Sequence, residues 1–205
     1  MHPGPYSRSP RPLGAAMRAE TDALAARFGP PLVRAVPLDS IAFDPLGHPG
    51  RFAEVCMVVR RPGGGVLLSI KRFYPRGAYR LPTGGIDRDE PILDAVVRET
   101  HEETGLRPAV ERFLAALTYH DGPGGPPVFH TFAFLLDDRT DDPVRPLDEH
   151  EQLEDAREVP VAELPAVADR LARIAPDAAP GPATWDAWGR FRSHIHRAVF
   201  EALAG

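Results

Sequence analysis

The chain has 205 residues, of which 43% are hydrophobic and 26% are charged. This composition suits one domain with an extension, or at most two small domains, folded around a core of its own. The formal net charge of −5 gives no overall attraction to nucleic acid or to an anionic membrane, so an anionic substrate would need local basic residues or metal ions.

Cys56 is the single cysteine, which excludes an intrachain disulfide framework and a cysteine-based zinc cluster. It lies in an apolar run that favours a buried, inert thiol. No apolar run approaches the roughly 20 residues that a membrane helix needs. The N-terminus lacks the hydrophobic stretch of a secretory signal. We therefore expect a cytoplasmic protein.

The predicted elements, in chain order, begin with a disordered tail over residues 1–14, which are rich in proline, glycine, serine and arginine. A helix–strand extension over 15–50, a main domain over 51–174, and a linker with a C-terminal helix over 175–205 follow. Runs of β-branched and apolar residues predict strands at 32–38, 54–60, 66–72, 110–119, 128–136 and 157–161. Amphipathic patterns predict helices at 17–28, 163–174 and 184–203. With a further helix near residue 100, this order indicates an α+β fold in which helices pack on a mixed sheet.

The helix near residue 100 has recognisable start and stop signals. Asp89 is its expected N-cap, Pro91 fits its first turn, and Gly105 is expected to end it after Thr104.

Three glutamates, Glu99, Glu102 and Glu103, fall within an arc of about 100° on the last two turns of this helix. Carboxylates this close repel one another, and the helix macrodipole disfavours negative charge near the C-terminus. Arg98 could neutralise one of them, and hard divalent cations, Mg²⁺ or Mn²⁺, the others. The alternative is a solvated acidic face. Gly84, which permits a tight turn at a fixed distance upstream, favours the cation site.

The stretch 84–106, GGIDRDEPILDAVVRETHEETGL, resembles the Nudix hydrolase box, Gly-x5-Glu-x7-Arg-Glu-hydrophobic-x-Glu-Glu-x-Gly-hydrophobic. The matching positions are Gly84, Glu90, Arg98, Glu99, Glu102, Glu103, Gly105 and Leu106. Thr100 departs from the box, because it stands where an aliphatic residue is usual, but its methyl group can still pack. The surrounding strands extend the resemblance over about 50–160.

The resemblance implies a Nudix-type α/β/α sandwich with a mixed β-sheet and a loop-helix-loop catalytic motif. The implied reaction is hydrolysis of a nucleoside diphosphate linked to another group. A pyrophosphate is anionic and would be repelled by three glutamates unless metal ions bridge the two. The same ions lower the pKa of a bound water.

The resemblance also implies a role for each residue of the box. The metal, Mg²⁺ with Mn²⁺ as a substitute, would be bound by Glu99, Glu102, Glu103 and the backbone carbonyl of Thr83. One of these glutamates can act as the base. Arg98 would orient a glutamate and Glu90 would hold the loop, while Gly84 and Gly105 have structural roles.

The flanks of the box are similar to the ADP-ribose and nucleotide-sugar pyrophosphatase branch, so an ADP-ribose-like substrate is favoured. That branch has a proline-containing loop beyond the box, for which 120–124 is the candidate. It also has an acidic loop that completes the metal site or supplies a base, and we expect Glu149 or Glu151 to serve here. An exposed acidic turn is the alternative. Two features depart from that branch: the stretch KRFYP at 71–75 replaces a Gln-Tyr-Arg-type stretch, and the proline loop lacks the usual serine and acid.

Substrate contacts are expected from basic and aromatic residues near the box. The basic candidates for phosphate binding are Lys71, Arg72, Arg76 and Arg80. The aromatic candidates for stacking on a base are Tyr119, together with Tyr74, Tyr79 and Phe129. The alternatives are surface arginines and core aromatic residues. Trp185 and Trp188 follow helical spacing and are expected to be packing residues of the C-terminal helix, on which His194 and His196 are expected at the surface.

The sequence thus predicts a metal-dependent pyrophosphohydrolase with a small-molecule nucleotide substrate. A non-catalytic nucleotide-binding sensor on the same fold and a nucleoside triphosphate pyrophosphohydrolase are the alternatives. Capped RNA is disfavoured because the chain is acidic and lacks a basic stripe, and no membrane partner is expected. The resemblance to that branch also implies that the N-terminal helix and strand exchange between two subunits, giving a homodimer.

Overall fold

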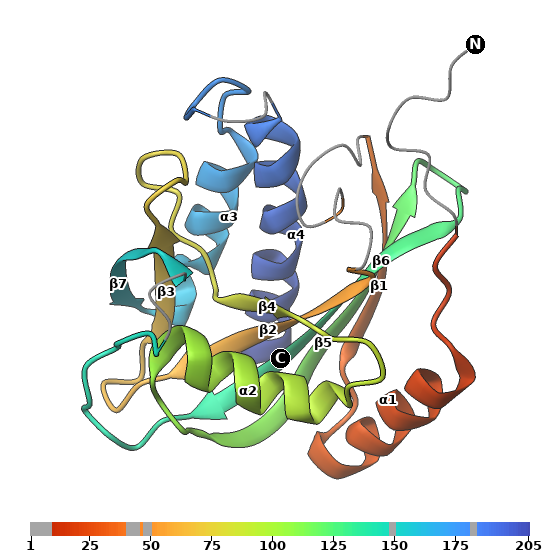
Figure 1. Ribbon diagram of the computed structural model, residues 1–205, viewed down its shortest axis with the longest axis horizontal. Coiled ribbons are helices and arrows are strands. Elements are labelled where there is room, and N and C mark those ends of the chain that lie inside the picture. Colours follow the sequence, from red (N-terminus) through yellow and green to blue (C-terminus); the bar gives the residue numbers. More distant parts are fainter. Residues whose placement is uncertain (1–9, 40–45, 47–50, 148–150, 181–183) are drawn as a thin grey trace.

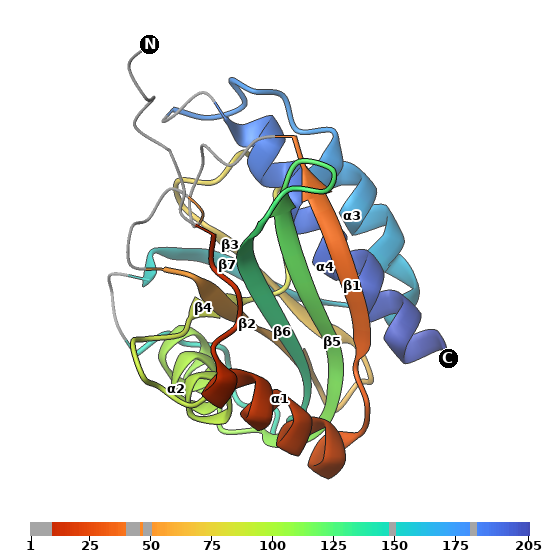
Figure 2. The same cartoon turned by 90° about the vertical axis from the view of Figure 1, so that its right-hand side faces the viewer.

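The computed structural model describes residues 10–39, 46, 51–147, 151–180 and 184–205, and the statements below concern these residues. They form a twisted sheet with helices on both faces (Figure 1). Figure 2 shows helices on each face of the sheet, and they pack into separate hydrophobic cores. On one face are α1 (Ala15–Phe28) and α2 (Ile92–Thr104), and on the other are α3 (Leu164–Ala172) and α4 (Trp185–Ala204). The predicted α+β class and α/β/α sandwich are confirmed.

Seven strands build the sheet in the described part of the chain. They are β1 (Leu32–Leu38), β2 (Ala53–Arg60), β3 (Val66–Lys71), β4 (Thr83–Gly85), β5 (Ala109–Asp121), β6 (Pro127–Asp137) and β7 (Leu153–Val159). The order is β1-β5-β6-β2-β3-β7, with β4 paired to β2. The pairs β1–β5 and β2–β6 are parallel and the other pairs are antiparallel, so the sheet is mixed.

The strand β2 lies between two hydrophobic cores, because successive side chains of a strand point to opposite faces of the sheet. Val55 and Met57 pack into the core on the α2 side. Cys56 and Val58 pack into the core on the α4 side, where the Cys56 thiol is fully buried as predicted. Every residue of β2 except the last is buried, which is why the sequence shows a continuous apolar run there.

The pairing of β4 with β2 fixes the start of the box on the sheet. The hairpin partner β3 pairs with β2 only at Arg60 and Val66, which leaves the edge of β2 free near its beginning. β4 occupies that edge, with Thr83 opposite Cys56 and Gly84 opposite Val55. The loop that precedes α2 is thereby anchored in the middle of the molecule.

Two predicted boundaries were wrong. Asp89 is not the N-cap of α2: it adopts a φ of 62°, and the helix begins at Ile92 with Pro91 at the N-cap. The carboxylate of Glu90 accepts a hydrogen bond from the backbone N–H of Asp87 instead. The last strand, β7, lies earlier than 157–161, because Pro160 has no N–H for a sheet ladder. There the chain turns into the 3-10 helix η2 (Val161–Glu163).

The expected end of α2 is confirmed, since Gly105 is its C-cap in the left-handed conformation with a φ of 74°.

The surface position expected for His196 is wrong. Its ring is fully buried in α4, where Nε2 accepts a hydrogen bond from the N–H of Leu81 and Nδ1 donates to the carbonyl of Arg192. None of the helices in the described ranges is long and apolar enough to cross a membrane.

Candidate active site

The last two turns of α2 place three carboxylates next to β4. Glu99 and Glu103 are only 9% and 7% exposed, and Glu102 is half-buried. Burial disfavours a charged carboxylate. It raises the pKa of Glu99 to about 7, with the negative charge of Glu103 as the next cause. Burial also raises the pKa of Glu103. This end of α2 therefore favours the approach of a cation.

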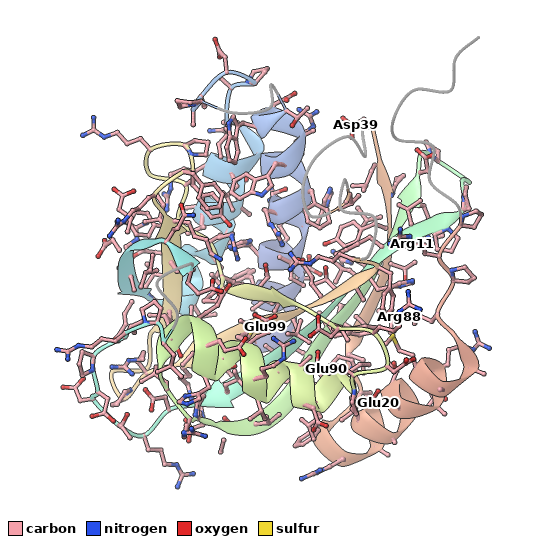
Figure 3. The ribbon with its side chains drawn as sticks, in the orientation of Figure 1. Arg11, Glu20, Asp39, Arg88, Glu90 and Glu99 are labelled. Atoms are coloured by element: carbon pink, nitrogen blue, oxygen red, sulfur yellow. The ribbon has the colours of Figure 1, made fainter. Side chains whose placement is uncertain are left out.

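Arg98 connects these carboxylates to the loop before the helix (Figure 3 labels Glu90 and Glu99). Its Nη1 lies 2.9 Å from both Glu99 Oε1 and Glu102 Oε2. Its Nε and Nη2 donate to the two oxygens of Glu90 at 2.7 and 2.8 Å, and Nη2 also donates to the carbonyl of Gly85. The same guanidinium is the main cause of the lowered pKa of Glu90. The roles of Arg98 in orienting a glutamate and of Glu90 in holding the loop stay predictions.

Lys71, at the end of β3, holds the third carboxylate. Its Nζ lies 3.2 Å from Glu103 Oε1 and 2.7 Å from Glu151 Oε2. Burial acts to lower the pKa of this ammonium, but the charge of Glu103 and further contacts outweigh it, and the pKa is raised. Lys71 thus joins the box to the segment just before β7, which is where the predicted Glu151 lies.

Gly84 has no room for a side chain. A Cβ built at this position would lie 2.0 Å from Cδ and 2.1 Å from Oε2 of Glu99. Gly85 is similar, since its Cβ would lie 2.7 Å from Nε of Arg51. Both charged side chains therefore lie directly on the backbone of β4, and a side chain at either glycine would displace them.

The donor set fits a hard divalent cation. Within the described ranges, no three His, Cys, Asp or Glu side chains are already gathered as a cation site, since Arg98 bridges two of the box carboxylates and Lys71 holds the third. The groups that face one cavity nevertheless include the three box carboxylates and Thr83, and oxygen donors are what Mg²⁺ and Mn²⁺ prefer. The ligands Glu99, Glu102, Glu103 and Thr83 stay a prediction.

A cavity of about 220 Å³ opens above these residues. Its acidic side is formed by the three box glutamates and Glu151, and its floor includes Thr83 and Gly84. Four basic residues also line it, namely Arg51, Lys71, Arg80 and Arg192. The remaining wall contains the aromatic residues Phe73, Tyr74, Trp185 and Trp188.

Arg80, one of the predicted phosphate-binding residues, is buried and its guanidinium is fixed by hydrogen bonds. It is 2% exposed. Its Nη1 donates to the carbonyl of Leu81 and to Thr83 Oγ1, and its Nε and Nη2 donate to the hydroxyl of Tyr74. The guanidinium is held rigidly in the cavity wall.

The predicted substrate contacts divide into two groups. Lys71 and Arg80 line the cavity, whereas Arg72 is exposed and is not among the described lining residues. Tyr119 was wrongly assigned: it is 1% exposed and packs in the core, with ring centroids 4.5 Å from Phe191 and 6.3 Å from Phe129. Glu149 lies outside the described residues.

The sequence interpretation missed Arg51 and Arg192 and treated the two tryptophans only as packing residues. Trp185 and Trp188 do pack, being 8% and 4% exposed, but they also form cavity wall. Their spacing of three on a helix is the same for either role. The box lies far earlier in the chain, at residues 84–106. Only the fold, which brings the tryptophans to the same cavity as the box, distinguishes a ligand-contacting role from a packing role.

The comparison with known families decides the assignment of this arrangement. A model described as NUDIX domain matches residues 50–180. The chain belongs to the Nudix hydrolase family.

Among curated proteins, an RNA pyrophosphohydrolase of Bartonella tribocorum (strain CIP 105476 / IBS 506) is 62% identical to this Nudix protein over 29 residues. Those residues are 14% of this chain, and the match spans only 17% of the length of that relative.

Solved structures of Nudix proteins are also similar. The MutT protein of Methanosarcina mazei Go1 has a TM-score of 0.41 at 17% identity, covering 71% of this chain and 94% of that one. An Ap4A hydrolase of C. elegans has a TM-score of 0.44 at 21% identity, covering 58% and 86%. A Nudix hydrolase of Nitrosomonas europaea has a TM-score of 0.43 at 21% identity, covering 70% and 90%. Values this low give no information about the substrate.

Proposed function

We propose that the protein hydrolyses the pyrophosphate bond of a nucleoside diphosphate linked to another group, with an ADP-ribose-like substrate favoured. The observation that carries this proposal is that the box glutamates share one cavity with four basic residues. Carboxylates suit a divalent cation, and arginines suit phosphate oxygens, which they can bind in pairs. The two sets together match an anionic substrate bound with a cation.

In this proposal the glutamates of α2 hold Mg²⁺ or Mn²⁺. Such a cation supplies neutralisation of the phosphoryl oxygens and a water of lowered pKa. Arg98 keeps two carboxylates at a fixed separation through its Nη1. One of the three box glutamates is our candidate for the base that takes a proton from water. Glu151, held by Lys71, is our candidate for completing the acidic side.

The charge of Glu102 provides the test of catalysis. We expect Glu102→Gln to lower kcat/KM by at least roughly 100-fold, because loss of one electrostatic contact in an active site has an effect of this size. The variant should still fold, because Glu102 is only half-buried. The measurement is phosphate or nucleotide release with Mg²⁺. Glu111→Gln, an exposed glutamate of β5 that pairs with Arg60, is the matched control and should keep full activity. Unchanged hydrolysis by Glu102→Gln would make the catalytic assignment wrong.

The substrate is tested by a panel measured with Mg²⁺ and with Mn²⁺, with both products identified. ADP-ribose, a nucleotide sugar, a dinucleotide and a nucleoside triphosphate form the panel. Release of AMP and ribose 5-phosphate from ADP-ribose would support the favoured substrate. Activity on triphosphates alone would replace it with a nucleoside triphosphate pyrophosphohydrolase, and binding without hydrolysis of any compound would indicate the nucleotide sensor.

The expected homodimer and the cytoplasmic location stay predictions. The dimer would use the N-terminal helix and strand, α1 and β1, of which β1 forms an edge of the sheet. An edge strand offers unpaired backbone groups to a second chain. Light scattering on the purified protein distinguishes the mass of one chain from that of two.

A further inference from the structure

The aromatic wall of the cavity is built from two segments that are far apart in sequence. Tyr74 follows β3, and Trp185 and Trp188 lie in the first turn of α4. The ring centroids of Tyr74 and Trp188 are 4.9 Å apart, those of Tyr74 and Trp185 are 6.1 Å apart, and those of the two tryptophans are 5.3 Å apart. All three rings line the cavity that also contains the box glutamates.

This wall is held in place by polar contacts at its rim. Trp185 Nε1 donates to the carbonyl of Ala179 at 3.1 Å. The hydroxyl of Tyr74 accepts two hydrogen bonds from Arg80, whose guanidinium also lies 5.3 Å from the centre of the Tyr74 ring. A ligand would therefore meet aromatic surfaces that need little ordering on binding, which reduces the entropic cost of the contact.

Arg192 lies one helical turn after Trp188 and is only 4% exposed. Its Nη1 donates to Oε1 of Glu54 at 2.7 Å, and the hydroxyl of Thr131 donates to the same oxygen. Its Nε is buried and has no hydrogen-bond acceptor among the described residues. A buried donor without an acceptor is costly in a folded protein. Protein groups thus leave the Arg192 guanidinium incompletely paired, and because Arg192 lines the cavity, its positive charge is available to an anionic group that enters there.

We propose that the beginning of α4 is the subsite for the nucleotide base of the substrate, with Tyr74, Trp185 and Trp188 contacting the base and Arg192 binding the adjoining phosphate. This rests on the proposed function, in which the cavity takes a nucleoside diphosphate derivative. The cavity of about 220 Å³ is smaller than the roughly 300–1,000 Å³ typical of ligand pockets. It accordingly encloses one end of the substrate, and the group beyond the cleaved bond extends outside.

The tryptophans provide a direct test, because Trp185 and Trp188 are the two tryptophans of the chain. Intrinsic fluorescence therefore reports only on this wall. The full-length protein is titrated in EDTA, where no metal-dependent hydrolysis occurs, with AMP, adenosine, ribose 5-phosphate and inorganic pyrophosphate. We expect saturable quenching by AMP, with ribose 5-phosphate binding at least about 10-fold more weakly, which corresponds to the lower end of base–aromatic stacking.

Variants assign the contact, with affinities measured by calorimetry. Trp188→Leu should weaken AMP about 10-fold and leave ribose 5-phosphate unchanged. Arg192→Lys keeps a positive charge beside Glu54 but loses the planar fork, so it should weaken AMP and ribose 5-phosphate alike and leave adenosine unchanged. Phe28→Leu, which removes an aromatic contact between α1 and Phe134, is the control and should bind AMP as the unaltered protein does.

Equal affinity for AMP and ribose 5-phosphate in the unaltered protein would overturn the proposal. So would an unchanged AMP affinity in a folded Trp188→Leu protein. If circular dichroism shows that Trp188→Leu does not fold, Tyr74→Leu replaces it with the same expectation, since Tyr74 is half-buried. AMP binding by a protein that hydrolyses none of the panel would refute the proposed function and keep the subsite. Hydrolysis of the panel without AMP quenching would do the reverse.

Discussion

The carboxylate of Glu99 is held between Arg98 and Gly84, and each of the two restricts its position in a different way. Arg98 holds one carboxylate oxygen by a charged hydrogen bond of 2.9 Å, while the other oxygen lies on the bare backbone of Gly84. Such a carboxylate has little freedom to move, so its position depends on the absence of a methyl group at residue 84.

The prediction at this scale concerns that methyl group. In Gly84→Ala the new Cβ would lie 2.0 Å from Glu99 Cδ, so Glu99 must move by an ångström or more. A misplacement of about 1 Å in an active site costs about 100-fold in rate, and we expect kcat/KM to fall by that order while the protein stays folded. Hydrolysis assays together with circular dichroism measure both.

Gly63→Ala is the matched control. Its Cβ would meet only Glu158 Oε2, at an ordinary contact distance of 3.5 Å, in the turn between β2 and β3. Activity should be unchanged there. Full activity in Gly84→Ala would show that the position of Glu99 does not matter for the reaction.

At the scale of elements, the segment that contains Arg145 and Leu147 caps the C-terminal end of α2. The sequence pattern did not predict this contact. The N–H groups of Arg145 and Leu147 donate to the carbonyls of Thr104 and Glu102. These carbonyls belong to the last turn, where no intrahelical donor is available. The segment leading toward Glu151 is thus tied to the helix that carries the other carboxylates.

We expect Gly105→Ala to destabilise the protein more than Gly77→Ala. Both glycines have a positive φ, 74° and 77°, and an alanine in that conformation costs about 1 kcal/mol. At Gly105 the Cβ would also lie 2.4 Å from the carbonyl oxygen of Arg145, whereas at Gly77 it would meet nothing within 4 Å. Urea unfolding of both variants gives the comparison, and equal losses would contradict the proposed contact.

Most of the elements could be predicted from periodicity alone, because a strand buried on both faces and an amphipathic helix leave distinct patterns. β1 was predicted with its observed ends, and β2, β5 and β6 within two residues. The start of α2 was not predicted, since aspartate is a common N-cap residue and Asp89 stands at a suitable position. Only the hydrogen bond from the N–H of Asp87 to the Glu90 carboxylate shows that this turn is closed differently. A local sequence pattern does not contain that choice.

At the scale of the whole molecule, His196 fastens α4 to the segment that leads into β4. Its Nε2 accepts from the N–H of Leu81 at 2.9 Å, so the ring must be neutral: a proton on Nε2 would place two donors against each other. The pKa of His196 is lowered to about 3, mainly by burial; the charges of Arg80 and Arg192 act in the same direction, and the hydrogen bond to the carbonyl of Arg192 acts against it.

The pH dependence of stability follows from that shift. The pKa of histidine in an unfolded chain is about 6.5, so between about pH 6.5 and 3 the unfolded chain binds a proton that folded His196 does not. This contribution to stability is fully present above pH 6.5 and is lost as the pH falls. Between pH 7 and pH 5 the loss is about 2 kcal/mol. His196→Gln, which keeps an acceptor for Leu81, should lose less stability over that interval, as urea unfolding at the two pH values would show. An identical loss in both proteins would refute a neutral buried His196.

The acidic half of the candidate site could be predicted because its glutamates are close together in sequence and meet on one helix. The other half could not. Arg51 precedes β2, Arg192 and the tryptophans follow α3, and no spacing rule relates them to the box. The wrong assignment of Tyr119 has the same origin, since a tyrosine on a strand reads alike whether it faces a ligand or, as here, Phe191.

The pair formed by Glu54 and Arg192 also affects the order of events during synthesis. The two residues are 138 positions apart, and translation at about 5–20 residues per second separates them by roughly 7 to 28 s. During that interval the Glu54 carboxylate, 1% exposed in the finished protein, lacks Arg192, and a buried charge without its partner is strongly unfavourable. We therefore expect the centre of the sheet to close only after α4 has been synthesised, and a chaperone that shields this surface would find it available until then.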